Sequence, residues 1–182
     1  MPATAVLITG TVGAGKSTTA DKIGDALQAQ GVPHAVIDLD EIRRFWPTPA
    51  DDPFGFEVEL RNLRPLAANY VASGARRLVL AGVCETRDDR LRYEVTMGLP
   101  LVVCRLHASL PVLRARLELR HVNDPVGLRW HLGRAGQLDA ILDAADVADF
   151  QLEVDSRSPH DVAAEILKTL EWARSRAGHD AE

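Results

Sequence analysis

Residues 10–18 read Gly-Thr-Val-Gly-Ala-Gly-Lys-Ser-Thr, and these residue types at this spacing can bind a chain of phosphates. The glycines let the backbone turn tightly, so that several N–H groups converge on one anion. An apolar run precedes the segment, and a helical pattern follows it and adds unpaired N–H groups of its own. A strand, a glycine-rich turn with Gly-Lys-Ser and then a helix form the phosphate-binding P-loop. We therefore predict that a nucleoside triphosphate binds here.

Two side chains of this loop have predicted roles of their own. Lys16 can reach the outer phosphates, and the Ser17 hydroxyl can ligate a phosphate-bound magnesium ion. The predicted cofactors are ATP and Mg²⁺, although the sequence does not separate ATP from GTP. The predicted nucleotide-binding residues are Gly10, Thr11, Val12, Gly13, Ala14, Gly15, Lys16, Ser17, Thr18, Arg116 and Arg157.

Two carboxylates, Asp38 and Asp40, follow the second apolar run. One can hold magnesium through water while the other accepts a proton from an attacking hydroxyl, and the pattern does not say which is the base. The alternative is a helix N-terminus that carries acids because they favour its dipole. The third apolar run lacks the terminal aspartate that many P-loop motor ATPases use for magnesium. This leaves Asp38 or Asp40, and less plausibly Glu85, for the metal, which favours a small-molecule kinase.

Three arginines, Arg114, Arg116 and Arg120, follow the fourth apolar run within seven residues. On a helix, Arg116 and Arg120 share a face. Arginine donors that close over the transferred phosphoryl group lower the barrier to its transfer. The alternative is a solvated helix face that Glu118 partly neutralises. We predict a lid over about residues 110–136, with Arg116 and Arg120 as catalytic residues beside Lys16, Asp38 and Asp40.

The elements that position these residues can be read from the apolar pattern. Short runs that are apolar at consecutive positions indicate strands buried on both faces, and amphipathic stretches between them indicate helices. Strands are expected at 4–9, 34–38, 77–82, 101–106 and 150–154, and helices at 16–30, 57–73, 110–120 and 160–175. Their alternation predicts an α/β fold: a P-loop NTPase-type three-layer sandwich, with a five-stranded parallel sheet flanked by helices. We expect residues 1–182 to form a single domain. The turn at 155–159, with Arg157, is expected to lie against the adenine base.

Composition narrows the function classes. The chain has 182 residues, 46% of them hydrophobic and 26% charged, which fits a globular protein with one large core. Its net charge of −5 argues against a long nucleic-acid partner. No apolar stretch approaches the roughly 18–20 residues of a membrane span, and no signal sequence is visible, so we expect a cytoplasmic location. Cys84 and Cys104 are expected to be reduced packing residues. The oligomeric state stays open, with a homodimer as one alternative.

The first half of the chain, from Met1 to about Tyr93, resembles adenylylsulfate kinase. The resemblance lies in the P-loop and in four short motifs: Asp38-x-Asp40-x-Ile42-Arg43, Asn62-Leu63-Arg64, Ser73-Gly74 before a strand, and Arg87-Asp-Asp-Arg90. It implies that Asp40 lies near the accepting hydroxyl, and that Arg43, Asn62 and Arg64 contact a nucleotide-like acceptor. Arg87 is expected to help to position that acceptor.

The second half departs from that family. The Arg-Asp-Pro-Lys-Gly-Leu-Tyr lid and the later Phe-Thr-Gly and Tyr-Glu segments of adenylylsulfate kinase are missing. The segment 113–121 instead carries an Arg-Leu-x-x-Arg pattern, which is similar to the lids of gluconate kinase and chloramphenicol phosphotransferase. The resemblance therefore implies nucleotide binding and phosphoryl transfer but does not identify the acceptor.

The sequence thus predicts an ATP-dependent phosphotransferase that moves the γ-phosphoryl group to a hydroxyl of a small molecule. The acceptor is expected to be nucleotide-like, sugar-like or antibiotic-like. A polynucleotide or nucleoside kinase is the first alternative, and net acidity weighs against its longer substrates. A nucleotide-binding regulator or an ATPase without an acceptor is the second, against which the acidic pair and the arginine lid argue. No membrane partner is expected.

Overall fold

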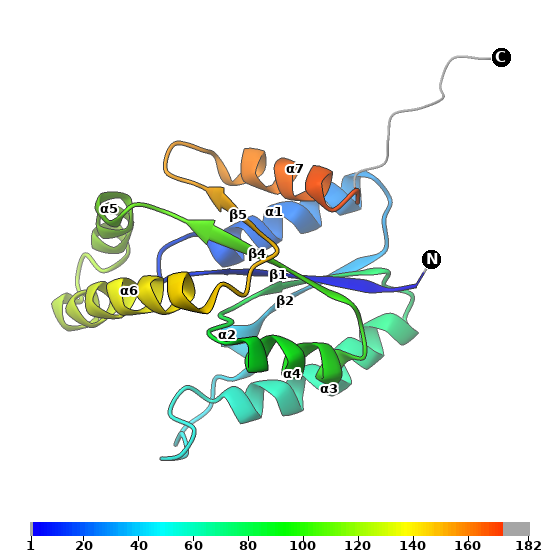
Figure 1. Ribbon diagram of the computed structural model, residues 1–182, viewed down its shortest axis with the longest axis horizontal. Helices are drawn as coiled ribbons and strands as arrows, with labels where there is room; N and C mark the ends of the chain where they lie inside the picture. Colours follow the sequence, from blue (N-terminus) through cyan, green and yellow to red (C-terminus); the bar gives the residue numbers. More distant parts are fainter. Residues whose placement is uncertain (1, 173–182) are drawn as a thin grey trace.

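The computed structural model describes residues 2–172 and contains one five-stranded sheet within that range. The strands are β1 (Thr4–Gly10), β2 (His34–Asp38), β3 (Arg77–Ala81), β4 (Leu101–His107) and β5 (Phe150–Glu153). All of them pair in parallel, in the order β2-β3-β1-β4-β5 (Figure 1). The predicted parallel sheet is confirmed, with strand ends that differ from the expected ones by one residue at most.

The middle strand explains why the apolar runs are continuous rather than alternating. Ala5, Val6, Leu7 and Ile8 of β1 have no exposed area. β1 pairs with β3 on one side and with β4 on the other, and helices cover both faces of the sheet. A strand in that position has no face toward water, so it excludes polar side chains on both faces.

Two pairs of helices form the outer layers of the sandwich (Figure 1). On one face lie α1 (Lys16–Ala29) and α7 (Pro159–Thr169), whose apolar sides join the core cluster that contains Ile23, Leu27 and Ile166. On the other face lie α3 (Phe56–Ala72) and α4 (Arg87–Met97), in the cluster that contains Leu63 and Tyr93. α4 was not among the predicted helices. The expected last helix, 160–175, is shorter, because α7 ends at Thr169, and its residues 173–175 lie outside the described residues.

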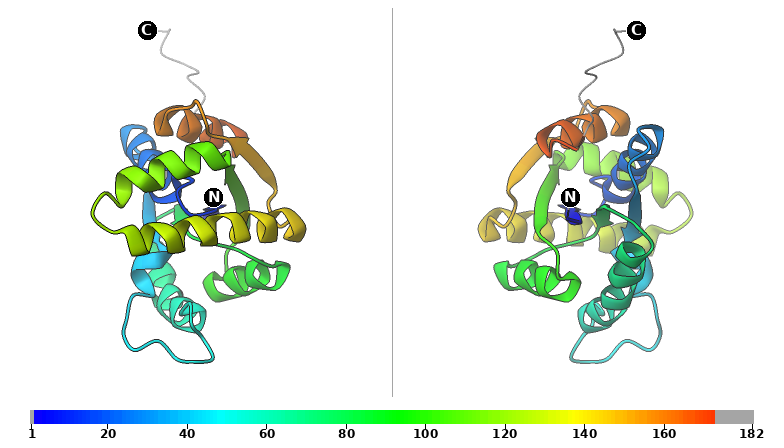
Figure 2. Two further views of the ribbon diagram at one scale, coloured as in Figure 1. Left: turned by 90° about the vertical axis from the view of Figure 1, so that its left-hand side faces the viewer. Right: turned by 90° about the vertical axis from the view of Figure 1, so that its right-hand side faces the viewer.

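Three further helices lie toward the carboxyl ends of the strands. The short α2 (Leu39–Ile42) follows β2 directly, and α5 (Leu110–Arg120) and α6 (Pro125–Ala145) cross the end of the sheet (Figure 2). Arg105 of β4 ties the second half of α6 to the sheet through Asp139 at 2.8 Å and Asp143 at 2.7 Å. The predicted lid therefore corresponds to α5 and the first half of α6. None of the helices in the described residues combines the length and apolar character that crossing a membrane needs.

The helix ends follow from local chemistry. The Ser158 hydroxyl accepts a hydrogen bond from the backbone N–H of Asp161, and Pro159 occupies the first position of α7. Serine at the N-cap and proline at the first helical position both favour the start of a helix. Gly31, just past the end of α1, has a φ of 64°, a conformation that glycine adopts without strain.

Candidate active site

The turn between β1 and α1 has the backbone that an anion site requires. Gly10 has a φ of 148°, and a Cβ atom placed on it would lie 2.5 Å from the carbonyl oxygen of Leu106. Only glycine fits there, so the turn can stay close to β4. The N-cap of α1, Gly15, offers no side-chain cap, which leaves the first amides of the helix free for a ligand.

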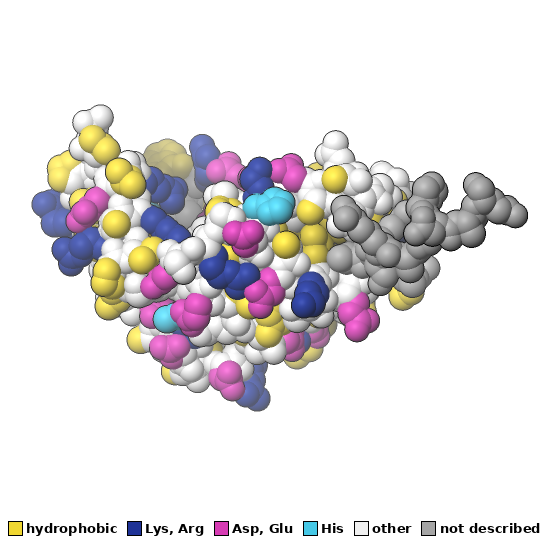
Figure 3. Space-filling model, turned by 90° about the horizontal axis from the view of Figure 1, so that it is seen from above, with side chains coloured by type: hydrophobic (Ala, Val, Ile, Leu, Met, Phe, Trp, Pro, Cys, Tyr) yellow, Lys and Arg dark blue, Asp and Glu magenta, His cyan; other side chains and the backbone are white. Residues whose placement is uncertain are grey.

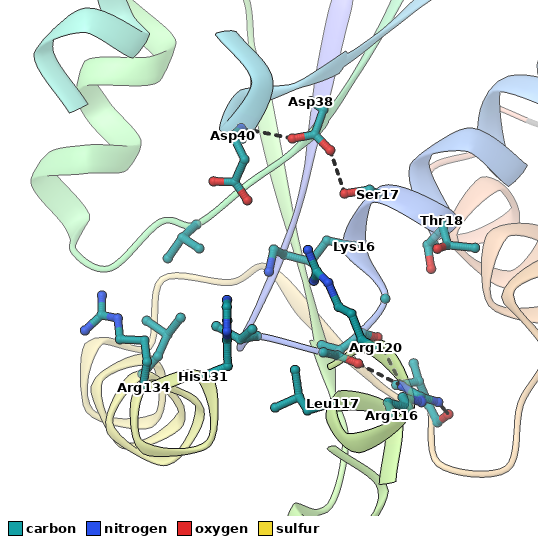
Figure 4. Close-up of a pocket in the computed structure, with 18 of the residues that line it drawn as sticks. Lys16, Ser17, Thr18, Asp38, Asp40, Arg116, Leu117, Arg120, His131 and Arg134 are labelled. Carbon is teal, nitrogen blue, oxygen red and sulfur yellow. Dashed lines mark hydrogen bonds between the residues drawn. The ribbon is translucent and has the colours of Figure 1, made fainter. Parts of the chain in front are cut away.

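A cavity of about 850 Å³ opens over this turn, at the carboxyl end of the sheet. Phosphate-loop residues line one side of it (Figure 4). The remaining lining residues come from the ends of β2 and β5, from the segments before α3 and after β3, and from α5, α6 and α7. Most of the predicted site residues line it: Val12, Gly13, Ala14, Gly15, Lys16, Ser17, Thr18, Asp38, Asp40, Arg43, Arg116, Arg120 and Arg157.

Asp38 connects the phosphate loop to the segment that follows β2. Its Oδ2 accepts a hydrogen bond from the Ser17 hydroxyl at 2.6 Å, and its Oδ1 accepts one from the backbone N–H of Asp40 at 2.9 Å (Figure 4). The second bond caps the four-residue helix α2. Both oxygens of Asp38 are therefore committed to orienting neighbours, whereas the side chain of Asp40 is 53% exposed. The two carboxylates have different surroundings, which a division of roles requires.

Lys16 bends back over the loop, and its ammonium group donates to the carbonyl of Thr11 at 3.2 Å. Burial lowers the pKa of Lys16, and the carboxylates of Asp40 and Asp38 partly oppose that shift. The side chain of Thr11 does not line the cavity. Its hydroxyl donates to the carbonyl of Ala135 at 2.7 Å and so fixes the loop to α6.

The two lid arginines do different things. The guanidinium of Arg116 donates to the carbonyls of Gly13 at 3.3 Å, Ala14 at 3.4 Å and Val154 at 3.0 Å. It therefore fixes the backbone of the phosphate loop. Arg120 points from α5 toward Lys16 (Figure 4) and forms no hydrogen bond or ion pair within residues 2–172. Its guanidinium is available to a ligand.

Positive side chains gather toward the α5 end of the molecule (Figure 3). Arg157, in the turn before α7, also lines the cavity, but its guanidinium is anchored on α7. It donates to the carbonyl of Asp161 at 3.3 Å and pairs with the carboxylate of Glu165.

Three predicted acceptor-binding residues do not line this cavity. Asn62 donates to the carbonyl of Ile42 at 2.6 Å and thereby fixes the end of α2. Arg64 lines a separate groove of about 460 Å³ between α3 and α4. Arg87 is the exposed first residue of α4. The contact of these residues with an acceptor stays a prediction.

One group of cavity residues was not singled out from the sequence as a site. Arg134 of α6 pairs with the carboxylate of Glu85, which follows β3, and its guanidinium lies 4.8 Å from the centre of the Phe54 ring. These three side chains close the side of the cavity away from α7. From the sequence, Glu85 was interpreted only as a possible metal ligand.

Arg134 was missed because its helix was missed. The helix propensity of α6 is lowered by three glycines within it, Gly127, Gly133 and Gly136. A signal was nevertheless present, because the buried residues Ala135, Leu138 and Leu142 follow helical spacing.

The five-stranded parallel sheet with its flanking helices is a fold that the chain shares with several solved kinases. The adenylylsulfate (APS) kinase CysC of Mycobacterium tuberculosis, solved in complex with AMPPNP and APS, superposes with a TM-score of 0.64. It is 24% identical to this chain, and the match covers 94% of this chain and 99% of that one.

Two further structures match at a similar level. The tunicamycin resistance protein of Deinococcus radiodurans has a TM-score of 0.65 at 18% identity, covering 92% of this chain and 95% of that one. A gluconokinase of Sinorhizobium meliloti 1021 has a TM-score of 0.58 at 18% identity, covering 96% and 98%. The predicted resemblance to APS kinase and gluconate kinase is thus confirmed at the level of fold.

Sequence comparison adds a match to one family model. The model described as Zeta toxin matches residues 2–85, which contain the phosphate loop and the acidic pair. No protein with a curated description matches the chain significantly in sequence.

Proposed function

We propose that the protein is an ATP-dependent phosphotransferase that moves the γ-phosphoryl group to a hydroxyl of a small molecule. The observation that carries this proposal is the arrangement of Ser17, Asp38 and Asp40. It brings to one wall of the cavity a hydroxyl of the phosphate loop, the carboxylate of Asp38 that accepts from it, and the half-exposed carboxylate of Asp40, which Arg43 contacts. The second carboxylate lies where an acceptor hydroxyl can approach the end of a bound triphosphate.

The residues of this wall fit a magnesium ion. Mg²⁺ prefers oxygen ligands and in nucleotide sites takes few of them from the protein. Ser17 and Asp38 supply a hydroxyl and a carboxylate 2.6 Å apart, beside the loop that would hold the phosphates. When bound there, the ion would neutralise charge on the phosphate oxygens. Asp38 is then the residue that holds the metal, directly or through water.

Asp40 is the better candidate for the base, since both oxygens of Asp38 accept hydrogen bonds, whereas Arg43 contacts only Oδ1 of Asp40. As base, it would accept the proton of the attacking hydroxyl. Lys16 and the loop amides would hold the phosphates, and Arg120 would bind the equatorial oxygens of the transferred group. Arg116 would keep the loop in shape for them, through the three carbonyls it contacts.

The acceptor class is left as nucleotide-like, sugar-like or antibiotic-like. The APS bound to the mycobacterial kinase supports the first, and the names of the gluconokinase and the tunicamycin resistance protein support the second and third. The phosphate-binding core and the lid segment at about 110–136 would work as one domain over residues 1–182.

The test measures ADP release by the full chain with ATP and Mg²⁺, with and without a panel of acceptors. The panel comprises APS, gluconate, tunicamycin and a set of nucleosides. Acceptor-dependent ADP release, with the phosphorylated acceptor found by mass spectrometry, would support the proposal. Release that no acceptor changes would favour an ATPase, and binding of ATP without any release would favour a regulator.

A further inference from the structure

A buried carboxylate lies directly behind the candidate base. Glu59 belongs to α3, its side chain is 1% exposed, and it does not line the cavity. Its Oε1 accepts a hydrogen bond from the hydroxyl of Tyr93 in α4, another fully buried side chain. Burial of a carboxylate costs free energy, and an apolar residue of similar size is often as stable or more stable at such a position. The core alone therefore does not explain a glutamate here.

Arg43 links this carboxylate to the site. One nitrogen of its guanidinium lies 3.1 Å from Oε2 of Glu59, and another contacts the carboxylate of Asp40. The arginine is 23% exposed at its side chain, and it stands between a buried carboxylate and a half-exposed one. The contact with Glu59 is an ion pair rather than a hydrogen bond, since Oε2 of Glu59 has no hydrogen-bond partner within the described residues. The guanidinium is rigid and planar, so attraction at one nitrogen also orients the other.

The segment that carries Asp40 needs such a support. α2 has only four residues, which is too short to be stable by itself. Asn62, which bonds the carbonyl of Ile42, comes from the same face of α3 as Glu59. Two positions of α3 thus hold the end of α2, and only Glu59 acts through a charge that reaches Asp40.

We propose that Glu59 and Tyr93 are positioning residues for the transfer step, holding Arg43 against Asp40 so that this carboxylate faces the acceptor. This inference rests on the proposed function of Asp40. It gives Arg43 a role in orienting the base Asp40, and not only in binding the acceptor, because two nitrogens of its guanidinium already contact carboxylates.

The pair can exist in two hydrogen-bonded states. The Tyr93 hydroxyl has one proton, and it lies near both Glu59 and the carbonyl of Val83, at 3.2 Å from the latter. When Glu59 is ionised, it accepts a hydrogen bond from the Tyr93 hydroxyl and attracts Arg43. When Glu59 is protonated, it can donate to Tyr93, which then donates to Val83, and the attraction for Arg43 is lost.

Burial raises the pKa of Glu59 to about 7, so both states occur near neutral pH. The groups around Glu59 act in both directions. The Tyr93 hydrogen bond and the charge of Arg43 favour ionisation, whereas Asp40 on α2 and Asp89 on α4 oppose it. Cys84, after β3, is also near; burial raises its own pKa to about 12, so it stays neutral. Turnover should therefore rise as Glu59 ionises.

The test compares E59Q with the wild type and with E57Q. Glu57 is a matched control: it lies on the same helix, is exposed, and pairs with Arg92 outside the cavity. At saturating ATP, wild type and E57Q should gain about tenfold in kcat between about pH 6 and pH 8. E59Q should stay near the low-pH value throughout, with an ATP affinity within about twofold of wild type. A residue with a merely structural role would leave the shape of this profile unchanged.

A second measurement does not depend on activity. Crystal structures of wild type and E59Q with AMPPNP and Mg²⁺ should show Arg43 against Asp40 only in the wild type. If E59Q does not fold, Y93F replaces it. This variant keeps the carboxylate but loses the hydrogen bond that favours its ionisation, so the rise in kcat should move to higher pH than in the wild type. A wild-type pH profile in the variant, or an unmoved Arg43, would overturn the inference. Absence of acceptor-dependent ADP release by the wild type would instead overturn the proposed function, and the crystal structures would still decide the role of Glu59.

Discussion

The Ser17 hydroxyl donates a hydrogen bond of 2.6 Å to Oδ2 of Asp38 and thereby joins the first turn of α1 to the end of β2. The strand that precedes α1 is β1, and β1 and β2 are not adjacent in the sheet, since β3 lies between them. The bond therefore spans the crevice over β3, where ligands of open parallel sheets bind. The other carboxylate oxygen caps α2, so the same side chain orients Asp40. The two aspartates differ in what they can do, which leads to different expectations for their substitution.

Substitution of Asp40 by asparagine should strongly slow phosphoryl transfer without weakening nucleotide binding. The amide keeps the shape of the side chain but cannot accept the proton of the acceptor, so kcat should fall by about 10²–10⁴-fold. The affinity for ATP, measured by calorimetry, should change by less than about threefold. A D40N variant with wild-type turnover would remove Asp40 from the mechanism.

Substitution of Asp38 by asparagine should act through the metal. The amide is a poorer ligand for Mg²⁺ than a carboxylate, so the Mg²⁺ concentration for half-maximal activity should rise by about tenfold or more. Measurement of ADP release over a range of Mg²⁺ concentrations checks this. The binding of ATP–Mg²⁺ by D40N, which keeps Asp38, serves as the comparison. An unchanged magnesium requirement in D38N would show that Asp38 does not hold the ion.

Replacement of Lys16 by methionine should weaken nucleotide binding. The ammonium group is the one cationic side chain within the loop itself, and its loss should lower ATP affinity by about tenfold or more. The control is K22M on the same helix, since the side chain of Lys22 is 43% exposed, pairs with Asp25 and does not line the cavity. Equal affinities of K16M and K22M in a fluorescent-nucleotide titration would contradict the phosphate-binding role of the loop.

The two arginines of α5 should give different phenotypes when replaced by alanine. Arg120 forms no bond to the protein within the described residues, so R120A should fold normally and lose about 10²-fold or more in kcat, with a nearly unchanged KM for ATP. Arg116 holds three backbone carbonyls, so R116A should lower both the melting temperature and the ATP affinity. Exposed Arg114, which does not line the cavity, provides the control. Wild-type turnover in R120A would discard its role in transfer.

The parts of the molecule that depend on local sequence could be predicted, and the parts that depend on distant contacts could not. Val6 and Leu7 lie in a continuous apolar run, which signals a central parallel strand without further information. Glu59, by contrast, looks like any acid in the first turn of an amphipathic helix. Its surroundings are set by Tyr93, 34 residues away, and by Arg43, which follows the last residue of α2. No spacing rule connects these three.

The exclusion of Arg64 from the cavity has the same cause. The motif Asn62-Leu63-Arg64 can be read from the sequence, but the direction of each side chain is set by the rotation of α3 against the sheet. Buried Leu63 fixes that rotation, and Arg64 then points to the groove beside α4.

Stability should reveal Glu59 independently of any ligand. Its ordinary pKa of 4.5 applies to the unfolded chain, and burial raises the folded value to about 7. The unfolded chain then releases this proton at lower pH than the folded one, so the contribution to stability is fully present below about pH 4.5 and is lost as the pH rises through about 7. The loss has an upper bound on the order of 3 kcal/mol.

Urea unfolding of wild type, E59Q and E57Q at several pH values measures this loss. E59Q should lack this loss and exceed the wild type in stability at pH values above about 7, whereas E57Q should follow the wild type. Parallel curves for wild type and E59Q would mean that Glu59 titrates alike in both states, and the buried carboxylate behind Asp40 would then have no proton to switch.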